Sequence, residues 1–271
     1  MVRAPALLNA TRGAAQRQTR GGLLAVVLVG LAVWDAYAER LPDVADSWDV
    51  ALVAGLLLPA TFAVAWLLLP FAADPRTLPA ALLVGGLAAL LDLAGFEGCF
   101  NVAKILAFTL AGFAFVQMLD ALAWVVLVAA AIPWVDVASV YRGPTKAVVE
   151  EQPGLFERIS VAFAVPGEDA AARLGPPDVI FFALFLAAAA RFGLRVRATW
   201  VGMTAALSAT LVATYVFDLR GLPALPALSL GFLVPNADLV WRTSRGGGRG
   251  QRHHRHGRPH RQPSKSHHGS S

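Results

Sequence analysis

The stretch RGLPALPALSLGF, residues 220–232, puts Pro223 and Pro226 at the start of an apolar run near the C-terminus. Each proline biases the residue before it, Leu222 or Leu225, toward an extended conformation. Irregular backbone at membrane depth is tolerated only where protein buries it or water fills a cavity. The stretch therefore predicts an extended segment beside a polar site, or else a proline that simply opens the last helix.

The composition is that of a polytopic membrane protein. Of the 271 residues, 56% are hydrophobic and 15% are charged, whereas a soluble domain of this length carries about a quarter charged residues. The apolar residues come in blocks long enough to cross a bilayer as helices. We therefore predict an all-α fold, a polytopic transmembrane bundle of about eight helices. The expected spans are residues 22–38, 50–72, 78–95, 101–119, 121–140, 178–194, 198–217 and 223–240.

The distribution of charge orients these helices in the membrane. The N-terminal segment 1–21 and the connection RFGLRVR, residues 191–197, are basic, whereas residues 39–49 and 92–97 are acidic. With eight spans, the basic segments all fall on one side, which the positive-inside rule assigns to the cytoplasm. We therefore expect both termini in the cytoplasm and the loop 141–177 on the outside.

Two segments have the composition of flexible chain. The stretch PGEDAAARLGPP, residues 166–177, is typical of a flexible connection. The tail, residues 242–271, holds eight of the 23 Lys and Arg residues, all six His residues and no acidic, aliphatic or aromatic residue. It cannot bury a core, so we expect it to be disordered. It could bind anionic lipid or nucleic acid, and a solvated tail that fixes topology is the simpler interpretation.

The residue types that are missing from the predicted spans exclude two common kinds of catalytic site. Because every His lies in the tail, no span contains an HExxH zinc motif or a serine with a histidine base. Cys99 is the only cysteine, and we expect a buried, unreactive side chain. Asp92 and Lys104 could form a pair in the bundle interior. Intramembrane carboxylates are then the groups left for catalysis.

Two carboxylates have matched positions in the predicted bundle. Asp136 lies in WVDVASVY, about six residues before Arg142, and Asp178 lies in LGPPDVIFFALF, five residues after Arg173. On consecutive antiparallel helices, both carboxyls would lie roughly 8–9 Å inside the same membrane face. In such a site they would share one proton, which suits general acid–base attack of water on a peptide bond. The simpler alternative is that one Asp caps a helix and the other is solvated.

Three segments, WVDVASVY, LGPPDVIFFALF and LPALP, together resemble the presenilin and signal-peptide-peptidase family of intramembrane aspartyl proteases. That family carries a YD motif, a GxGD motif and a PAL motif in this order on successive helices. The resemblance implies that Asp136 and Asp178 are the catalytic pair. It also implies that Pro223, Ala224 and Leu225 organise the substrate.

The resemblance covers about residues 120–240, and it carries expectations about partners and location. It implies membrane-spanning protein substrates, neither a metal nor an organic cofactor, and the plasma membrane of a prokaryote; we infer no obligate partner. The family has nine helices, whereas we count eight spans. We divide the chain into a cytoplasmic segment 1–21, N-terminal transmembrane helices 22–119, a catalytic-type core 120–241 and the basic tail 242–271.

Two positions depart from the family motifs. Val135 stands where the family has tyrosine, and Pro177 stands at the second glycine of GxGD, although Gly175 matches the first. Proline is tolerated in the first helical turn, which would put Asp178 there and let the helix dipole favour its ionised form. We therefore expect Asp178 to act as the base, with the shared proton on Asp136. The alternative function is an inactive relative, or a small proton- or cation-coupled transporter that uses the same Asp pair.

Overall fold

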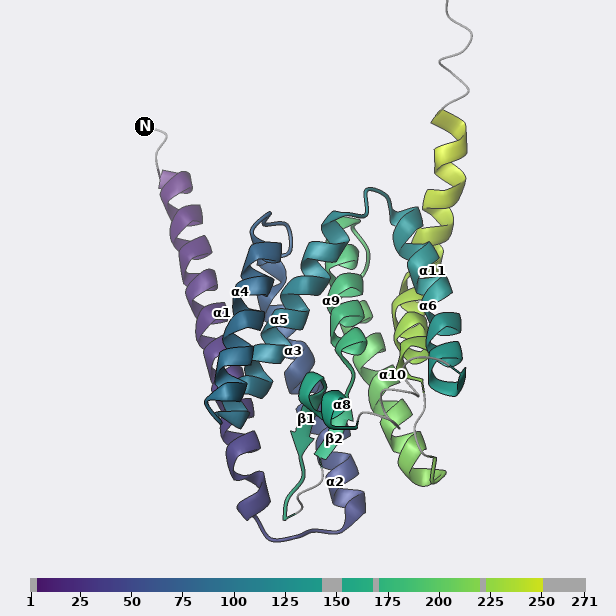
Figure 1. The fold of residues 1–271 in the computed structure, drawn as a ribbon. Helices are drawn as coiled ribbons and strands as arrows, with labels where there is room; N and C mark the ends of the chain where they lie inside the picture. Colours follow the sequence, from purple (N-terminus) through teal and green to yellow (C-terminus); the bar gives the residue numbers. More distant parts are fainter. Residues whose placement is uncertain (1–3, 143–152, 168–170, 220–222, 251–271) are drawn as a thin grey trace, which may run out of the picture. The chain divides into compact units, whose positions relative to one another are not determined.

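The computed structural model describes residues 4–142, 153–167, 171–219 and 223–250. The chain divides into two compact units, Met1–Asn236 and Ala237–Ser271, and all the candidate site residues lie in the first. The described chain is mostly helical (Figure 1). In chain order the elements are α1 (Ala4–Tyr37), α2 (Asp46–Leu52), α3 (Leu58–Leu68), α4 (Thr77–Leu93), α5 (Glu97–Gln117), α6 (Leu122–Arg142), α8 (Pro153–Ile159), β1 (Val161–Ala164), β2 (Ala171–Leu174), α9 (Pro176–Arg191), α10 (Val196–Val216) and α11 (Ala224–Gly250).

Each of the eight predicted spans overlaps one of these helices. Five helical segments among the described residues are long and apolar enough to cross a membrane, which is compatible with a multi-pass membrane protein. They are Gln18–Arg40, Asp46–Phe71, Glu97–Gln117, Val196–Val216 and Ala224–Arg242. Thr77–Leu93 and Leu122–Ala138 are shorter apolar helices. The predicted orientation of the termini stays a prediction.

The second of these segments contains a π-helical turn, Val53–Leu57, which joins α2 to α3. In a π-helical turn the carbonyl of Ala54 would pair with residue 59, and this residue is a proline without an N–H. The hydroxyl of Ser208 on α10 donates to the Ala54 carbonyl instead, at 2.7 Å. The irregular turn thus gives α10 a fixed polar contact.

α9 forms the centre of the first unit. Every residue from Phe182 to Ala189 is buried, as expected of a helix that is surrounded on all sides. The Phe182 ring stacks on Phe62 of α3 with centroids 3.8 Å apart, and Phe185 stacks on Phe232 of α11 at 4.7 Å. Figure 1 shows α9 between α5 on one side and α6 and α10 on the other.

Glycines let the helices around α9 approach closely. A Cβ at Gly112 of α5 would meet the carbonyl oxygen of Ile180 and lie 2.8 Å from the Cβ of Ala183. At the α10–α11 crossing, a Cβ on Gly202 would lie 2.6 Å from the carbonyl oxygen of Gly231. Small residues allow backbone-to-backbone packing of this kind between membrane helices. These glycines therefore set the spacing around the central helix.

The connection between α6 and α9 contains ordered structure that the sequence does not predict. α8 precedes an antiparallel hairpin in which Val161 of β1 lies opposite Leu174 of β2, and Ala164 lies opposite Ala171. The two strands are an exception within a mostly helical fold, and β2 and the start of α9 occupy residues 171–174 and 176–177 of the connection that was expected to be flexible. The strands form because Val161 and Phe163 are buried and because side chains of α1 and α5 supply hydrogen-bond partners to β1. Residues 143–152 and 168–170 lie outside the described part of the chain.

The expected disordered tail begins within a helix. α11 continues to Gly250, so residues 242–250 are helical rather than disordered. Residues 251–271, which include every histidine, lie outside the described residues. The disorder and the partners expected for them stay predictions.

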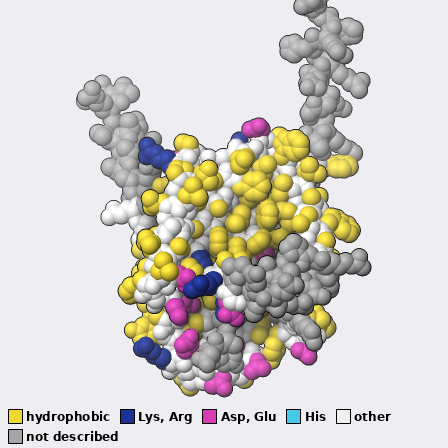
Figure 2. Space-filling model, in the orientation of Figure 1, with side chains coloured by type: hydrophobic (Ala, Val, Ile, Leu, Met, Phe, Trp, Pro, Cys, Tyr) yellow, Lys and Arg dark blue, Asp and Glu magenta, His cyan; other side chains and the backbone are white. Residues whose placement is uncertain are grey.

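Charged and apolar side chains separate on the surface. Figure 2 shows hydrophobic side chains over the middle of one face and acidic side chains toward its lower end. Glu39, Asp43 and Asp46, from the acidic segment expected on the outside, are exposed. Exposed leucines on α4, such as Leu82, Leu83 and Leu93, are suited to contact with lipid.

Candidate functional site

Asp178 lies in the first turn of α9, as expected. Gly175 precedes the helix, Pro176 and Pro177 occupy its first two positions, and Asp178 is the third residue. The prolines lack N–H groups, so they leave fewer unpaired donors at the helix start. The Asp178 carboxylate folds back and accepts a hydrogen bond of 3.1 Å from the Gly175 N–H. This is one half of a capping box.

Gly175 leaves room for this arrangement. A Cβ at position 175 would lie 3.2 Å from Oδ2 of Asp178, closer than most side chains pack. The backbone of Gly175 has an ordinary extended conformation, with φ of −64° and ψ of 149°. The glycine therefore makes room for the Asp178 carboxylate because it has no side chain, and its backbone angles are ones that other residues also adopt.

Asp136 caps a different helix. Its Oδ2 atom accepts a hydrogen bond of 3.1 Å from the backbone N–H of Leu225, in the first turn of α11. Pro223, the residue before this helix, has no side-chain acceptor with which to cap it, and Pro226 has no N–H. The Asp136 carboxylate on α6 therefore caps the N-terminal end of α11.

The segment Pro223, Ala224 and Leu225 is not extended along its length. Leu222 lies outside the described residues, and Pro223 directly precedes α11. Ala224 and Leu225 are helical, so the expectation of an extended Leu225 is wrong and the proline opens the last helix. The physical reason is that proline fits the N-terminal end of a helix without losing an intrahelical hydrogen bond.

The two aspartates lie on helices that pack against each other, α6 and α9. Both side chains are half-buried, whereas Val135, at the position of the family's tyrosine, is 66% exposed. Asp178 accepts a hydrogen bond at the start of α9, and Asp136 accepts one at the start of α11.

A strand edge leads directly to Asp178. β2 ends at Leu174, one residue before Gly175. Among the described residues, β2 pairs with β1 only, and no strand pairs with its other edge. β2 therefore leads, through Gly175, straight into the helix turn that carries Asp178.

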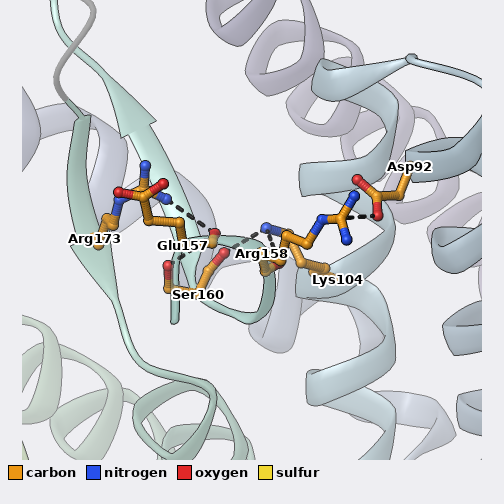
Figure 3. Close-up of polar contacts among 6 residues, drawn as sticks. All are labelled: Asp92, Lys104, Glu157, Arg158, Ser160 and Arg173. Carbon is orange, nitrogen blue, oxygen red and sulfur yellow. Dashed lines mark hydrogen bonds and ion pairs between the residues drawn. The ribbon is translucent and has the colours of Figure 1, made fainter. Parts of the chain in front are cut away.

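A polar network holds α8 and the hairpin against the N-terminal helices (Figure 3). The ammonium of Lys104, which is buried in α5, donates to the carbonyls of Arg158, at 3.1 Å, and Ser160. It also lies 4.2 Å from the centroid of the Phe100 ring. Asp92 of α4 is 3.6 Å from the Arg158 guanidinium. Asp92 and Lys104 therefore bind the α8 segment and do not form the expected pair with each other.

Two further observations concern residue types considered from sequence. Cys99 is exposed, which corrects the expectation of a buried thiol. Within the described ranges, no group of three or more His, Cys, Asp or Glu side chains is placed to hold a metal ion. Asn101, which makes the hairpin contacts discussed below, was not predicted, although an amide in an apolar span is a signal of a polar contact.

Comparison of the chain with protein-family models and with curated proteins finds no match. The class of protein that the residues themselves describe is a mostly helical, apolar bundle with two carboxyls at the ends of adjoining helices.

Proposed function

We propose that this protein is an intramembrane aspartyl protease that hydrolyses peptide bonds in membrane-spanning segments of other proteins. The observation that carries the proposal is the hydrogen bond between Asp136 and the Leu225 N–H, which joins α6 to α11. Both helices also contact α9, whose first turn carries the second carboxyl, Asp178. Three segments that are far apart in the chain supply these groups, and they are the three that resemble the family motifs.

The proposed reaction uses one ionised and one protonated carboxyl. The ionised carboxylate takes a proton from a water molecule, whose oxygen bonds to the peptide carbonyl carbon. The protonated carboxyl gives its proton to the carbonyl oxygen, which forms a gem-diol. When the C–N bond breaks, the leaving nitrogen takes a proton from one carboxyl and a gem-diol hydroxyl returns a proton to the other. The pair again holds a single proton.

The helix dipole does not decide which carboxyl is the base. Asp178 lies at the N-terminus of α9 and accepts the Gly175 N–H, and Asp136 faces the N-terminus of α11 and accepts the Leu225 N–H. Both helix ends favour negative charge. The argument that favours Asp178 as the base applies equally to Asp136, so we assign the proton to the pair.

The substrate would approach as an unwound chain. A peptide bond in a transmembrane helix is shielded by its own hydrogen bonds and has to be exposed before water can attack it. The free edge of β2 offers main-chain partners for such an extended segment, and β2 runs into the turn that carries Asp178. This supports a substrate that pairs with β2 while its scissile bond lies between the carboxyls.

A second function has one observation in its favour. Both carboxylates already accept helix-capping hydrogen bonds, which an inactive relative or a proton- or cation-coupled transporter would also use. Such a protein would use the two aspartates to cap helices and would not hydrolyse peptide bonds. The two functions therefore differ in whether the purified protein cuts a peptide bond.

The test is cleavage of a transmembrane reporter by the purified full-length protein in lipid nanodiscs. Wild type, Asp136→Ala and Asp178→Ala are compared, and the products are identified by mass spectrometry. We expect cleavage by wild type only. Cleavage that survives both substitutions, or no cleavage by wild type of any of several transmembrane reporters, would remove the protease hypothesis.

A further inference from the structure

The outer edge of β1 is closed by side chains of two helices. The carboxamide of Asn101 on α5 acts like a neighbouring strand, because its Nδ2 donates to the Ala162 carbonyl at 2.7 Å and its Oδ1 accepts from the Ala162 N–H at 3.0 Å. The Trp34 indole of α1 donates to the Ala164 carbonyl at 3.0 Å. An amide nitrogen and an indole nitrogen thus occupy positions that a third strand would fill.

These contacts fix which backbone groups face outward on β2. In an antiparallel pair, opposite residues either exchange hydrogen bonds or both point away from each other. Ala162 lies opposite Arg173, and its N–H and carbonyl point to Asn101, so those of Arg173 point to the far edge of β2. Ala164 and Ala171 are the next pair of this kind. The main-chain groups of Arg173 and Ala171 therefore point away from β1, toward an edge with which no described strand pairs.

The end of the segment before the hairpin is held from two sides. Lys104 donates to the carbonyls of Arg158 and Ser160, and Nη1 of Arg173 on β2 donates to the Glu157 carbonyl at 2.9 Å (Figure 3). Cations are favoured beside the carbonyl groups at a helix C-terminus. The Lys104 contact attaches α8 to α5, and the Arg173 contact attaches it to β2.

We propose that Asn101 is a positioning residue for the substrate strand. Together with Trp34 and Lys104, it closes the β1 edge and fixes the hairpin, so that an extended substrate segment pairs with β2 and with no other edge of this sheet. The register of that pairing then determines which peptide bond reaches Asp178. The inference rests on the proposed function, and it gives the N-terminal helices a role in substrate alignment.

The burial of Asn101 and Lys104 and their hydrogen bonds indicate that the hairpin is held in one position. Asn101 and Lys104 are 7% and 6% exposed, and burying such groups is costly unless their hydrogen bonds are made. The Asn101 carboxamide makes its two shorter hydrogen bonds, of 2.7 and 3.0 Å, to one strand residue, Ala162. Its Nδ2 also donates a longer bond of 3.4 Å to Oδ1 of Asp35 on α1. The polar side chain therefore serves the hairpin first and the contact with α1 second.

The test uses Asn101→Leu, which removes both hydrogen bonds to Ala162 and the longer one to Asp35. The matched control is Thr109→Val on the same helix, because Thr109 is 1% exposed and its hydroxyl has no hydrogen-bond partner among the described residues. Trp34→Phe is a second, milder variant that removes only the bond to Ala164. All are prepared as full-length protein in nanodiscs.

The first measurement is amide hydrogen exchange of residues 161–174, which does not depend on activity. Two hydrogen bonds of about 0.7 kcal/mol each correspond to about a tenfold change in an opening equilibrium. We expect about tenfold faster exchange in Asn101→Leu, a smaller increase in Trp34→Phe and none in Thr109→Val. Exchange in Asn101→Leu and Trp34→Phe that equals that of the control would overturn the anchoring.

The second measurement is reporter cleavage. We expect Asn101→Leu to raise KM about tenfold and to add cut sites that neighbour the wild-type site, while kcat changes less. An unchanged KM with unchanged cut sites, despite faster exchange, would overturn the role in substrate alignment. If wild type cuts no reporter, the proposed function fails and the alignment role fails with it, whereas the exchange experiment still decides the anchoring.

Discussion

The backbone N–H of Leu225 donates a hydrogen bond of 3.1 Å to Oδ2 of Asp136, across 89 positions of the chain. This bond joins the C-terminal part of α6 to the first turn of α11. Because a helix start has unpaired N–H groups, the contact has a structural value that is independent of any reaction. Structural and catalytic roles of Asp136 therefore have to be separated by experiment.

Asp136→Asn separates them. The amide oxygen can still accept from Leu225, so we expect the midpoint of thermal unfolding in nanodiscs to change little, within about 1 kcal/mol of free energy of unfolding. The amide cannot take or give the catalytic proton, so we expect reporter cleavage to fall by about 100- to 10,000-fold. Asp136→Leu is the comparison, since it removes the cap as well and costs about 0.5–2 kcal/mol. Wild-type cleavage by Asp136→Asn would contradict a catalytic Asp136.

Gly175→Ala tests the folded-back carboxylate of Asp178. The new Cβ would lie 3.2 Å from Oδ2, so the carboxyl has to shift and its bond to the residue 175 N–H weakens. We expect kcat to fall about tenfold or more, because a misplaced general base loses most of its effect. Gly154→Ala in α8 is the control, as nothing lies within 4 Å of its Cβ position. Equal activity of the two variants would show that Asp178 does not need its present geometry.

Gly112→Ala tests the packing of α5 on the central helix. Its Cβ would meet the Ile180 carbonyl oxygen and the Cβ of Ala183, so α5 and α9 must separate. Overpacking of this kind typically costs about 1–3 kcal/mol, which thermal unfolding in detergent would detect. Gly86→Ala in α4 has open space around its Cβ and should be close to neutral. A Gly112→Ala protein as stable as Gly86→Ala would contradict the close contact.

Thr199→Val tests the polar contact between α10 and α11. The buried carboxamide of Asn236 donates to the Thr199 hydroxyl at 2.8 Å, and its oxygen accepts from the Arg195 N–H at 3.0 Å. We expect a loss of about 0.6–1.7 kcal/mol in the free energy of unfolding. Thr204→Val on the same helix is the control, because the Thr204 hydroxyl is buried without a partner among the described residues. Equal stability of the two variants would argue against the Asn236 contact.

The helices could be predicted from the sequence because long apolar blocks have few other structures available in a membrane. The hairpin could not be predicted. VAFA and AARL, residues 161–164 and 171–174, are too short to show a strand's alternation. Their partners, Asn101 and Trp34, lie on helices far away in the chain.

The aspartates were singled out by their matched depth in the predicted bundle, and the PAL segment by its prolines and its resemblance to the family motif. The hydrogen bond between Asp136 and Leu225 brings one aspartate and the PAL segment together. The predicted extended conformation of the PAL segment was wrong, and the reason lies in the prolines themselves. A proline favours extended structure in the residue before it, yet it also fits the start of a helix, and the cap supplied by Asp136 favours the second outcome. A distant carboxylate leaves no trace in the local sequence.

The sequence positions of Lys104 and Asn101 predict that these side chains make polar contacts, but they do not predict the partners. A lysine and an asparagine within an apolar span indicate polar contacts in the interior. Their acceptors are main-chain carbonyls of Arg158, Ser160 and Ala162, and every residue has a carbonyl. The type of contact was therefore predictable, and the partner was not.

The attachment of the hairpin also has a consequence for biosynthesis. Chains are made from the N-terminus, so α1, α4 and α5 are translated before residues 153–174 emerge from the ribosome. Trp34 and Asn101 can therefore receive β1 as soon as it is made, and the nascent chain need never expose that edge to another polypeptide. The order of synthesis therefore makes the partners of the β1 edge available before the edge itself exists.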